Sequence, residues 1–154
     1  MVLGIGNPLR GDDGAGSRVA ALLLEPLPGE ARAGKVSFTV ISAGEVPESF
    51  LGPVVAARPD TVLLVDAGEM GAPPGSVALL EVEDLPEGPL FTHRTPLRLL
   101  AGVLRWETGA DVFLLAIQPR HLEWGEAMSS EVEEATRMVS LILGSAREGE
   151  ALPC

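Results

Sequence analysis

The stretch "GIGNPLRGDDGAG", residues 4–16, joins an apolar segment at the start of the chain to an apolar helical pattern. Its first glycines are spaced as in a phosphate-binding loop, where a ligand approaches the backbone closely. The dinucleotide-binding pattern needs a glycine where this chain has Leu9, however, and Asp12 and Asp13 place two carboxylates where a phosphate would bind. The stretch therefore predicts a strand-to-helix loop that does not serve a nucleotide.

The rest of the chain alternates short apolar runs with longer helical patterns. We expect strands at 1–6, 35–42, 61–67, 76–83 and 111–119, and helices at 14–25, 47–57, 95–106 and 126–147. In the last helix, one apolar face carries Val132, Ala135, Val139 and Ile142. The alternation predicts a three-layer α/β/α sandwich around a mostly parallel sheet of about five strands. We assign residues 1–147 to a single domain and residues 148–154 to a frayed C-terminal tail.

Composition narrows the classes of function. The 154 residues carry 11 basic and 22 acidic side chains, a net charge of −11, which opposes nucleic-acid binding and favours a cation or a basic partner. No apolar run reaches the roughly 18 residues of a membrane span, and the N-terminus lacks a signal-peptide pattern. The single cysteine, Cys154, excludes a disulfide framework and a cysteine metal cluster. We expect a cytoplasmic monomer without membrane insertion.

Polar residues gather where the predicted strands end, and ligands bind at that edge of a parallel sheet. They are Asn7, Asp12 and Asp13 after the first strand, Asp66 at the end of the third and Gln118 at the end of the last. We expect one of the paired aspartates to cap the first helix, with Asp12 in a structural role and Asp13 facing the cleft. His93 lies in the loop before the third helix, whereas His121 has no motif around it and is expected at the surface.

Asp66 follows a fully apolar strand, where a buried carboxylate needs a partner or a metal. Two carboxylates and one imidazole from separate loops, Asp13, Asp66 and His93, would suit a divalent first-row metal such as nickel or zinc. Ordinary structural or surface roles stay open for each of them. The chain has neither a His-Glu-x-x-His helix nor a Gly-x-Ser-x-Gly elbow, which argues against those zinc protease and serine hydrolase classes.

Four blocks occur in order along the chain: "GIGNPLRGDDGAG", "LLVDAGEMGAPPG", "FTHRTPL" and "AIQP". In these blocks, and over residues 1 to about 147, the chain resembles the [NiFe]-hydrogenase maturation endopeptidases. The branch it resembles most serves formate-linked or energy-converting membrane-bound hydrogenases. The resemblance implies a protease that recognises nickel already inserted into the large-subunit precursor and then removes a C-terminal extension. Nickel would be presented by the precursor, with no organic cofactor.

The resemblance also implies roles for individual residues. Asp13, Asp66 and His93 match the positions that bind nickel in the family, and Asp13 and Asp66 would also be catalytic. Asn7, Asp12 and Gln118 would support them. The family pattern has an acid at the end of the second strand, where this chain has Ser42. Either Glu45 substitutes for that acid or the acid is not required, and the sequence leaves both open.

Two other functions compete with this interpretation. Peptidyl-tRNA hydrolases also begin with a Gly-x-Gly-Asn-Pro strand end and are similar in fold, but they need a catalytic histidine close behind it and a basic groove for tRNA. This chain has Asp12 and Asp13 in that region and a net charge of −11. The second alternative is a nickel-binding maturation chaperone without peptidase activity, which cleavage of a nickel-loaded precursor would exclude.

Overall fold

The computed structural model describes residues 1–25, 39–81 and 97–148, and these form a five-stranded sheet with helices on both faces. The strands are β1 (Val2–Ile5), β2 (Val40–Gly44), β3 (Thr61–Ala67), β4 (Val77–Glu81) and β5 (Asp111–Ile117). The helices are α1 (Ala15–Leu24), α2 (Leu51–Ala57), α3 (Leu97–Thr108) and α4 (Ser130–Glu148). Two short 3-10 helices, η1 (Gly11–Gly14) and η2 (Pro47–Phe50), precede α1 and α2.

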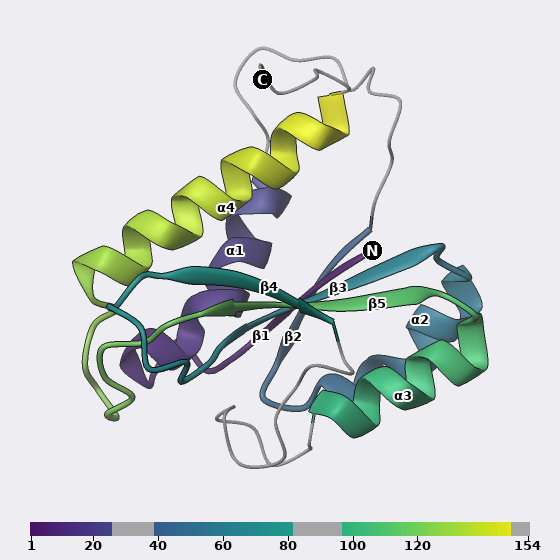
Figure 1. Ribbon diagram of the computed structural model, residues 1–154, viewed down its shortest axis with the longest axis horizontal. Coiled ribbons are helices and arrows are strands. Elements are labelled where there is room, and N and C mark those ends of the chain that lie inside the picture. The colour runs from purple at the N-terminus through teal and green to yellow at the C-terminus, as the bar shows by residue number, and fades with distance from the viewer. Residues whose placement is uncertain (26–38, 82–96, 149–154) are drawn as a thin grey trace.

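The strand order is β2-β1-β3-β5-β4, and every pair is parallel except β4 with β5. Helices α1 and α4 cover one face of the sheet, and α2 and α3 cover the other (Figure 1). Each face has its own apolar core, because the buried strands send alternate side chains to opposite faces. The three-layer sandwich and the mostly parallel sheet of five strands are confirmed.

The glycines of the first motif allow the start of α1 to pack directly against the strands. A Cβ atom at Gly16 would lie 2.0 Å from the Val65 carbonyl oxygen, and one at Gly4 would lie 2.1 Å from the Gly16 carbonyl oxygen. Gly6 has a φ of +130°, and a Cβ there would lie 1.8 Å from the carbonyl oxygen of Asp13. The loop is thus built for close approach by the protein's own helix, and these three positions leave no space for a phosphate.

The expectation that one of the paired aspartates caps α1 is wrong. The residue at the cap position is Gly14, with no side-chain hydrogen bond there, because η1 is inserted between the loop and the helix. The last helix also begins later than expected, at Ser130 rather than residue 126. The chain is held as a loop up to Ser129, whose backbone N–H is bonded to the side chain of Asp12. Within the expected apolar face of α4, Ile142 is half exposed.

Some expectations fall on residues outside the described ranges. They include the first part of the second strand (35–38), the last two residues of the expected 76–83 strand, and residues 95–96 of the third helix. The tail at 148–154 also lies outside them, apart from Glu148, the last residue of α4. Within the described part of the chain, no helix combines the length and apolar character needed to cross a membrane.

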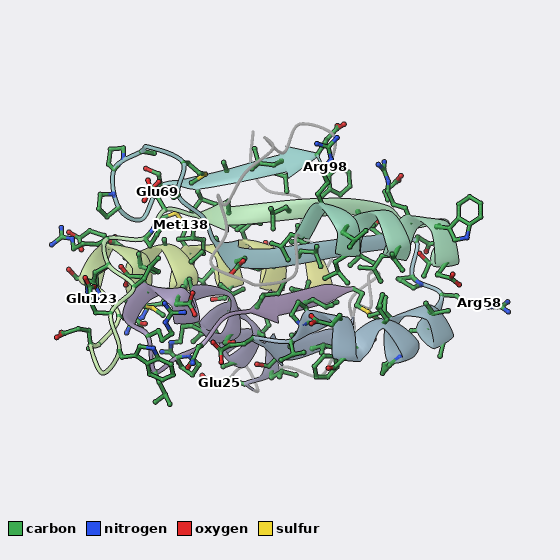
Figure 2. The ribbon with its side chains drawn as sticks, turned by 90° about the horizontal axis from the view of Figure 1, so that it is seen from below. Glu25, Arg58, Glu69, Arg98, Glu123 and Met138 are labelled. Atoms are coloured by element: carbon green, nitrogen blue, oxygen red, sulfur yellow. The ribbon has the colours of Figure 1, made fainter. Side chains whose placement is uncertain are left out.

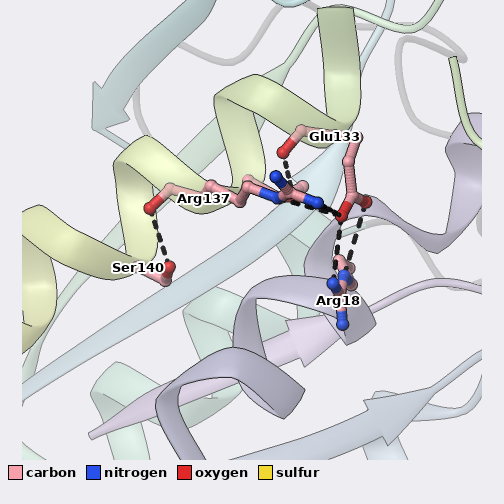
Figure 3. Close-up of polar contacts among 5 residues, drawn as sticks. Arg18, Glu133, Arg137 and Ser140 are labelled. Atoms are coloured by element: carbon pink, nitrogen blue, oxygen red, sulfur yellow. Dashed lines mark hydrogen bonds and ion pairs between the residues drawn. The ribbon is translucent and has the colours of Figure 1, made fainter. Parts of the chain in front are cut away.

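An ion pair ties α1 to α4 on their shared face of the sheet (Figure 3). Arg18 donates two hydrogen bonds to the Glu133 carboxylate, through Nη2 to Oε1 at 3.0 Å and through Nε to Oε2 at 3.4 Å. Arg137, four residues further along α4, donates to the same carboxylate. The bonds from Arg18 are the main reason why the pKa of Glu133 lies below its ordinary value.

Replacing Arg18 by Ala is expected to lower the free energy of unfolding at pH 7 by about 1 kcal/mol or less, because the pair is partly exposed. A carboxyl group with a lowered pKa stabilises the fold above its ordinary pKa of about 4.3 and loses that contribution as pH falls. The difference between parent and variant should therefore shrink below about pH 4. Urea titrations at pH 7 and below about pH 4 measure the difference in the free energy of unfolding between parent and variant, with Arg137→Ala as the matched control. That variant breaks a contact within one helix and should cost about 0.3–0.5 kcal/mol.

Candidate functional site

The buried polar residues of the first two motifs lie at the point where the sheet reverses its winding. The connection from β1 leads to β2 on one side, and the connection from β2 returns past β1 to β3 on the other. Open parallel sheets bind their ligands in the crevice beyond the strand ends at such a point. Figure 2 shows Glu69 and Glu123 on loops at that end of the sheet, and Arg58 at the opposite end. The loops after β1, β3 and β5 therefore frame the candidate site.

Asp13 lies in η1, over the end of β1, and is 1% exposed. Its Oδ2 accepts a hydrogen bond of 3.0 Å from the backbone N–H of Asn7. Its Oδ1 is buried and has no hydrogen-bond partner among the described residues. A buried carboxylate oxygen without a donor is unfavourable unless a cation or another donor completes it. Asp13 is thus placed to accept a ligand at this position.

Asp66 lies on the neighbouring strand, at the same edge of the sheet. Gly4 of β1 pairs with Val65 of β3, so Asp66 follows directly at the end of the paired segment. The carboxylate is fully buried, and its Oδ1 accepts a 2.8 Å hydrogen bond from the backbone N–H of Ala67. Alternation along the strand places Asp66 on the same face as Leu64, which packs in the core with α3. The structure therefore brings both acids to adjacent strand ends.

His93 lies outside the described residues, so the three-residue metal site stays a prediction. Within residues 1–25, 39–81 and 97–148, no three acidic, histidine or cysteine side chains are grouped to hold a metal. At the end of the second strand, Ser42 and Glu45 are both exposed. Neither is buried with the two aspartates. The third ligand that the resemblance implies is His93, which lies outside those ranges.

Asp12 has the structural role that was expected of it, by a different mechanism from helix capping. The carboxylate is fully buried and accepts four hydrogen bonds from the loop between β5 and α4. The backbone N–H groups of Arg120, His121 and Ser129 donate at 2.8, 3.3 and 2.6 Å, and the Ser129 hydroxyl donates at 2.9 Å. In return the backbone N–H of Asp12 donates to the His121 carbonyl. Asp12 therefore ties the first motif to the last loop of the site.

Replacing Asp12 by Ala should lower the free energy of unfolding by about 3 kcal/mol, because it leaves several buried donors unsatisfied. Ser129→Ala is the graded control: it removes only the hydroxyl bond and should cost about 1 kcal/mol. Equilibrium denaturation of both variants tests the ranking. Equal losses for the two variants would show that the Asp12 network does not hold the loop.

Gln118 and Asn7 act on the backbone around the two acids. The Gln118 Oε1 accepts hydrogen bonds from the backbone N–H groups of Met70 and Ala72, at 2.7 and 3.3 Å, and its Nε2 donates to Glu69 at 2.9 Å. It thus holds the loop that follows Asp66. The Asn7 Oδ1 accepts a 2.9 Å bond from the backbone N–H of Leu9 and shapes the turn before η1. Both side chains therefore hold backbone segments next to the two aspartates.

His121 is not the plain surface residue that its sequence context suggested. Its side chain is 26% exposed, and it packs against the backbone of Gly11, where a Cβ would lie 2.6 Å from its Nδ1. Ser129 was not singled out from the sequence at all. It bonds to Asp12 across 117 positions of the chain, and no local pattern indicates such a contact. Only the folded loop brings these two residues to the first motif.

The comparisons with known proteins come from sequence and from structure. A family model described as "Hydrogenase maturation protease" matches residues 25–145. The chain is 34% identical over 140 residues to the hydrogenase 3 maturation protease of Escherichia coli K12, covering 90% of this chain and 85% of that protein. The crystal structure of the [NiFe] hydrogenase maturation protease HycI from Thermococcus kodakarensis superposes with a TM-score of 0.83 at 29% identity, covering 96% of this chain and 91% of that one. The solution structure of the endopeptidase HycI from Escherichia coli gives 0.79 at 31% identity, covering 97% and 91%.

Proposed function

The chain belongs to the hydrogenase maturation protease family and is a peptidase, and we propose that it trims a C-terminal extension from the precursor of a [NiFe]-hydrogenase large subunit. We further propose that it recognises nickel already inserted into that precursor. The relative from Escherichia coli K12 is named for hydrogenase 3. From the resemblance of the sequence blocks, we propose that the substrate belongs to the formate-linked or energy-converting branch of membrane-bound hydrogenases.

The pair of buried aspartates at the winding reversal carries this proposal. Asp13 lies in η1, over the end of β1, and Asp66 lies at the end of the neighbouring strand β3. The Asp13 Oδ1 has no donor among the described residues. Two buried carboxylates at one site are mutually repulsive unless a cation lies between them. A nickel ion held by the precursor would supply that charge, and the His93 imidazole would supply the nitrogen ligand that nickel favours. Because the precursor holds the metal, the protease needs only an incomplete ligand set.

The cleavage step can then be written from the residues of this chain. One carboxylate of the pair accepts a proton from a water molecule while the water oxygen adds to the carbonyl carbon of the scissile peptide. The carbon–nitrogen bond breaks, and the proton passes to the leaving amine. A nickel ion in the substrate can assist by polarising the same carbonyl oxygen. With or without assistance from nickel, Asp13 or Asp66 is the carboxylate that contacts the reacting water.

The test uses the purified protein and a large-subunit precursor prepared with and without nickel. We expect the extension to be removed only from the nickel-loaded precursor, and we expect weak nickel binding by the protease alone, since its own ligand set is incomplete. Cleavage of both precursors at the same rate would contradict nickel recognition. His93→Ala should abolish processing without lowering the melting temperature. No processing of either precursor would contradict the substrate assignment itself.

The family match decides between the alternatives raised by the sequence. It supports a maturation protease over a peptidyl-tRNA hydrolase-like enzyme and over a nickel-binding chaperone without peptidase activity. The acidic pair, Asp12 and Asp13, is buried in η1 where the tRNA enzymes would need a histidine. A peptidyl-tRNA ester assay on the same preparation should therefore give no turnover.

A further inference from the structure

Strand β4 forms an open edge of the sheet. It pairs with β5 on one side and has no partner strand on the other among the described residues. The backbone N–H of Gln118 donates to the Ser76 carbonyl at 2.8 Å, which fixes the alternation of the antiparallel ladder. Ala78 and Leu80 therefore direct their backbone groups to β5. The backbone N–H and C=O groups of Val77, Leu79 and Glu81 point to the open edge, where another strand can pair with them.

An apolar groove runs beside this edge, between β4 and α4. It has a volume of about 330 Å³, and its apolar lining is Pro74, Val77, Ala135, Met138, Val139 and Ile142. Val77, Met138 and Ile142 are 45%, 57% and 48% exposed, so α4 does not cover this strip of the sheet. Leu79, two residues along β4 from Val77, lies on the same strand face and is 63% exposed. The edge and the groove together match an extended chain with apolar side chains at alternate positions.

The charges at the groove specify its occupant further. Glu131 and Glu134 line it, and none of its described lining residues is cationic. Arg120 pairs with Glu131, whereas Glu134 has no ion pair among the described residues. The whole chain has a net charge of −11. A segment with lysine or arginine beside its apolar residues fits this lining, and a second acidic copy of the same chain fits it poorly.

The groove leads to the site that contains the two aspartates. Its Pro74 and Gly75 belong to the loop that directly follows Asp66 and β3, and Gln118 bonds the backbone of that loop. Val77, at the start of β4, pairs with Ile117 at the end of β5, so this end of the groove lies at the site edge of the sheet. Figure 2 shows β4 as the outermost strand of the sheet and labels Met138, which belongs to α4. A chain lying in the groove would thus be directed towards the cleavage site.

We propose that the groove between β4 and α4 docks an extended apolar and basic segment of the precursor, which adds as a strand to β4. The inference rests on the proposed function, because it names the part of the enzyme that holds the same substrate. Strand addition supplies backbone hydrogen bonds, while Val77, Leu79, Met138 and Ile142 supply apolar contact. The nickel site then recognises the loaded metal, and the groove recognises the polypeptide.

The test compares two leucine variants of equal exposure. Leu79 and Leu99 are each 63% exposed, one on the open strand β4 and the other on α3, on the opposite side of the sheet. Leu79→Lys should lower kcat/KM for the nickel-loaded precursor about tenfold, because it places a cation where a basic, apolar segment binds. Saturating precursor should restore kcat to near the parent value. Leu99→Lys should match the parent in both constants, and both variants should keep the parent melting temperature.

Each outcome bears on one proposal. If the parent processes the precursor and Leu79→Lys does so with unchanged kcat/KM, the docking groove is refuted while the proposed function stands. If the parent itself fails to process, the proposed function fails. Sedimentation of the parent alone should show a monomer. A dimer that Leu79→Lys dissociates would show that the open edge binds a second copy, which would overturn the docking proposal.

Discussion

Replacing Asp13 by Asn is expected to lower the rate of precursor processing by about 100-fold or more while the fold is retained. The substitution conserves shape, and the amide oxygen can still accept the 3.0 Å hydrogen bond from the backbone N–H of Asn7. It removes the negative charge, and with it the ability to accept a proton and to ligate nickel strongly. The loss should appear in single-turnover processing of nickel-loaded precursor, with circular dichroism as the test of folding.

A matched control separates the site from the general acidity of the chain. Asp111 is exposed and opens β5, at the opposite end of the sheet from the candidate site. Asp111→Asn makes the same change of charge and should process precursor at the parent rate. If Asp13→Asn also trims at the parent rate, the assignment of Asp13 to the reaction is wrong. Equal losses in both variants would instead indicate an effect of net charge on encounter with the precursor.

Replacing Gly16 by Ala should have the largest effect on stability, a loss of more than about 4 kcal/mol in the free energy of unfolding. The added Cβ would lie 2.0 Å from the Val65 carbonyl oxygen and 2.4 Å from that of Ile5. Both are backbone atoms of the central strands, so neither can move aside without disturbing the sheet. The helix must shift outward instead, which separates Asp13 from the strand ends. Guanidinium denaturation of the variant measures the loss, and insoluble protein would be its extreme form.

The chain offers a helical glycine with the opposite environment. Gly102 lies in α3, and a Cβ added there has no heavy atom within 4 Å. Gly102→Ala should stabilise the protein by up to about 1 kcal/mol, because alanine restricts the unfolded chain and favours helix. The pair of variants therefore tests close packing against helix propensity. A destabilisation of similar size in both would show that the contact of α1 with β1 and β3 is not the cause.

The fold could be predicted from the sequence because its signals are local. "TVLLVDA" is an apolar run of strand length, and the structure has a strand over the same residues, 61–67. The strand expected over 111–119 is also present and ends two residues earlier, at Ile117. The candidate site could be located in outline for a related reason. Parallel strands share one C-terminal edge, so residues that follow different strands in the sequence must gather there. Asp13 and Asp66 were found by this rule, as was Gln118.

The sequence by itself determined the elements, their alternation and the acids at the strand ends, because spacing and burial of apolar residues act over a few positions. Only the tertiary structure decided how those acids are used. Asp12 lies shortly before α1 in the sequence, where a helix-capping aspartate is common. Its carboxylate instead accepts hydrogen bonds from a loop more than 100 positions away. The glycines that suggest a ligand loop instead admit α1 to the sheet. Such contacts depend on which surfaces meet after folding, and pairing across the chain leaves no periodic signal in the sequence.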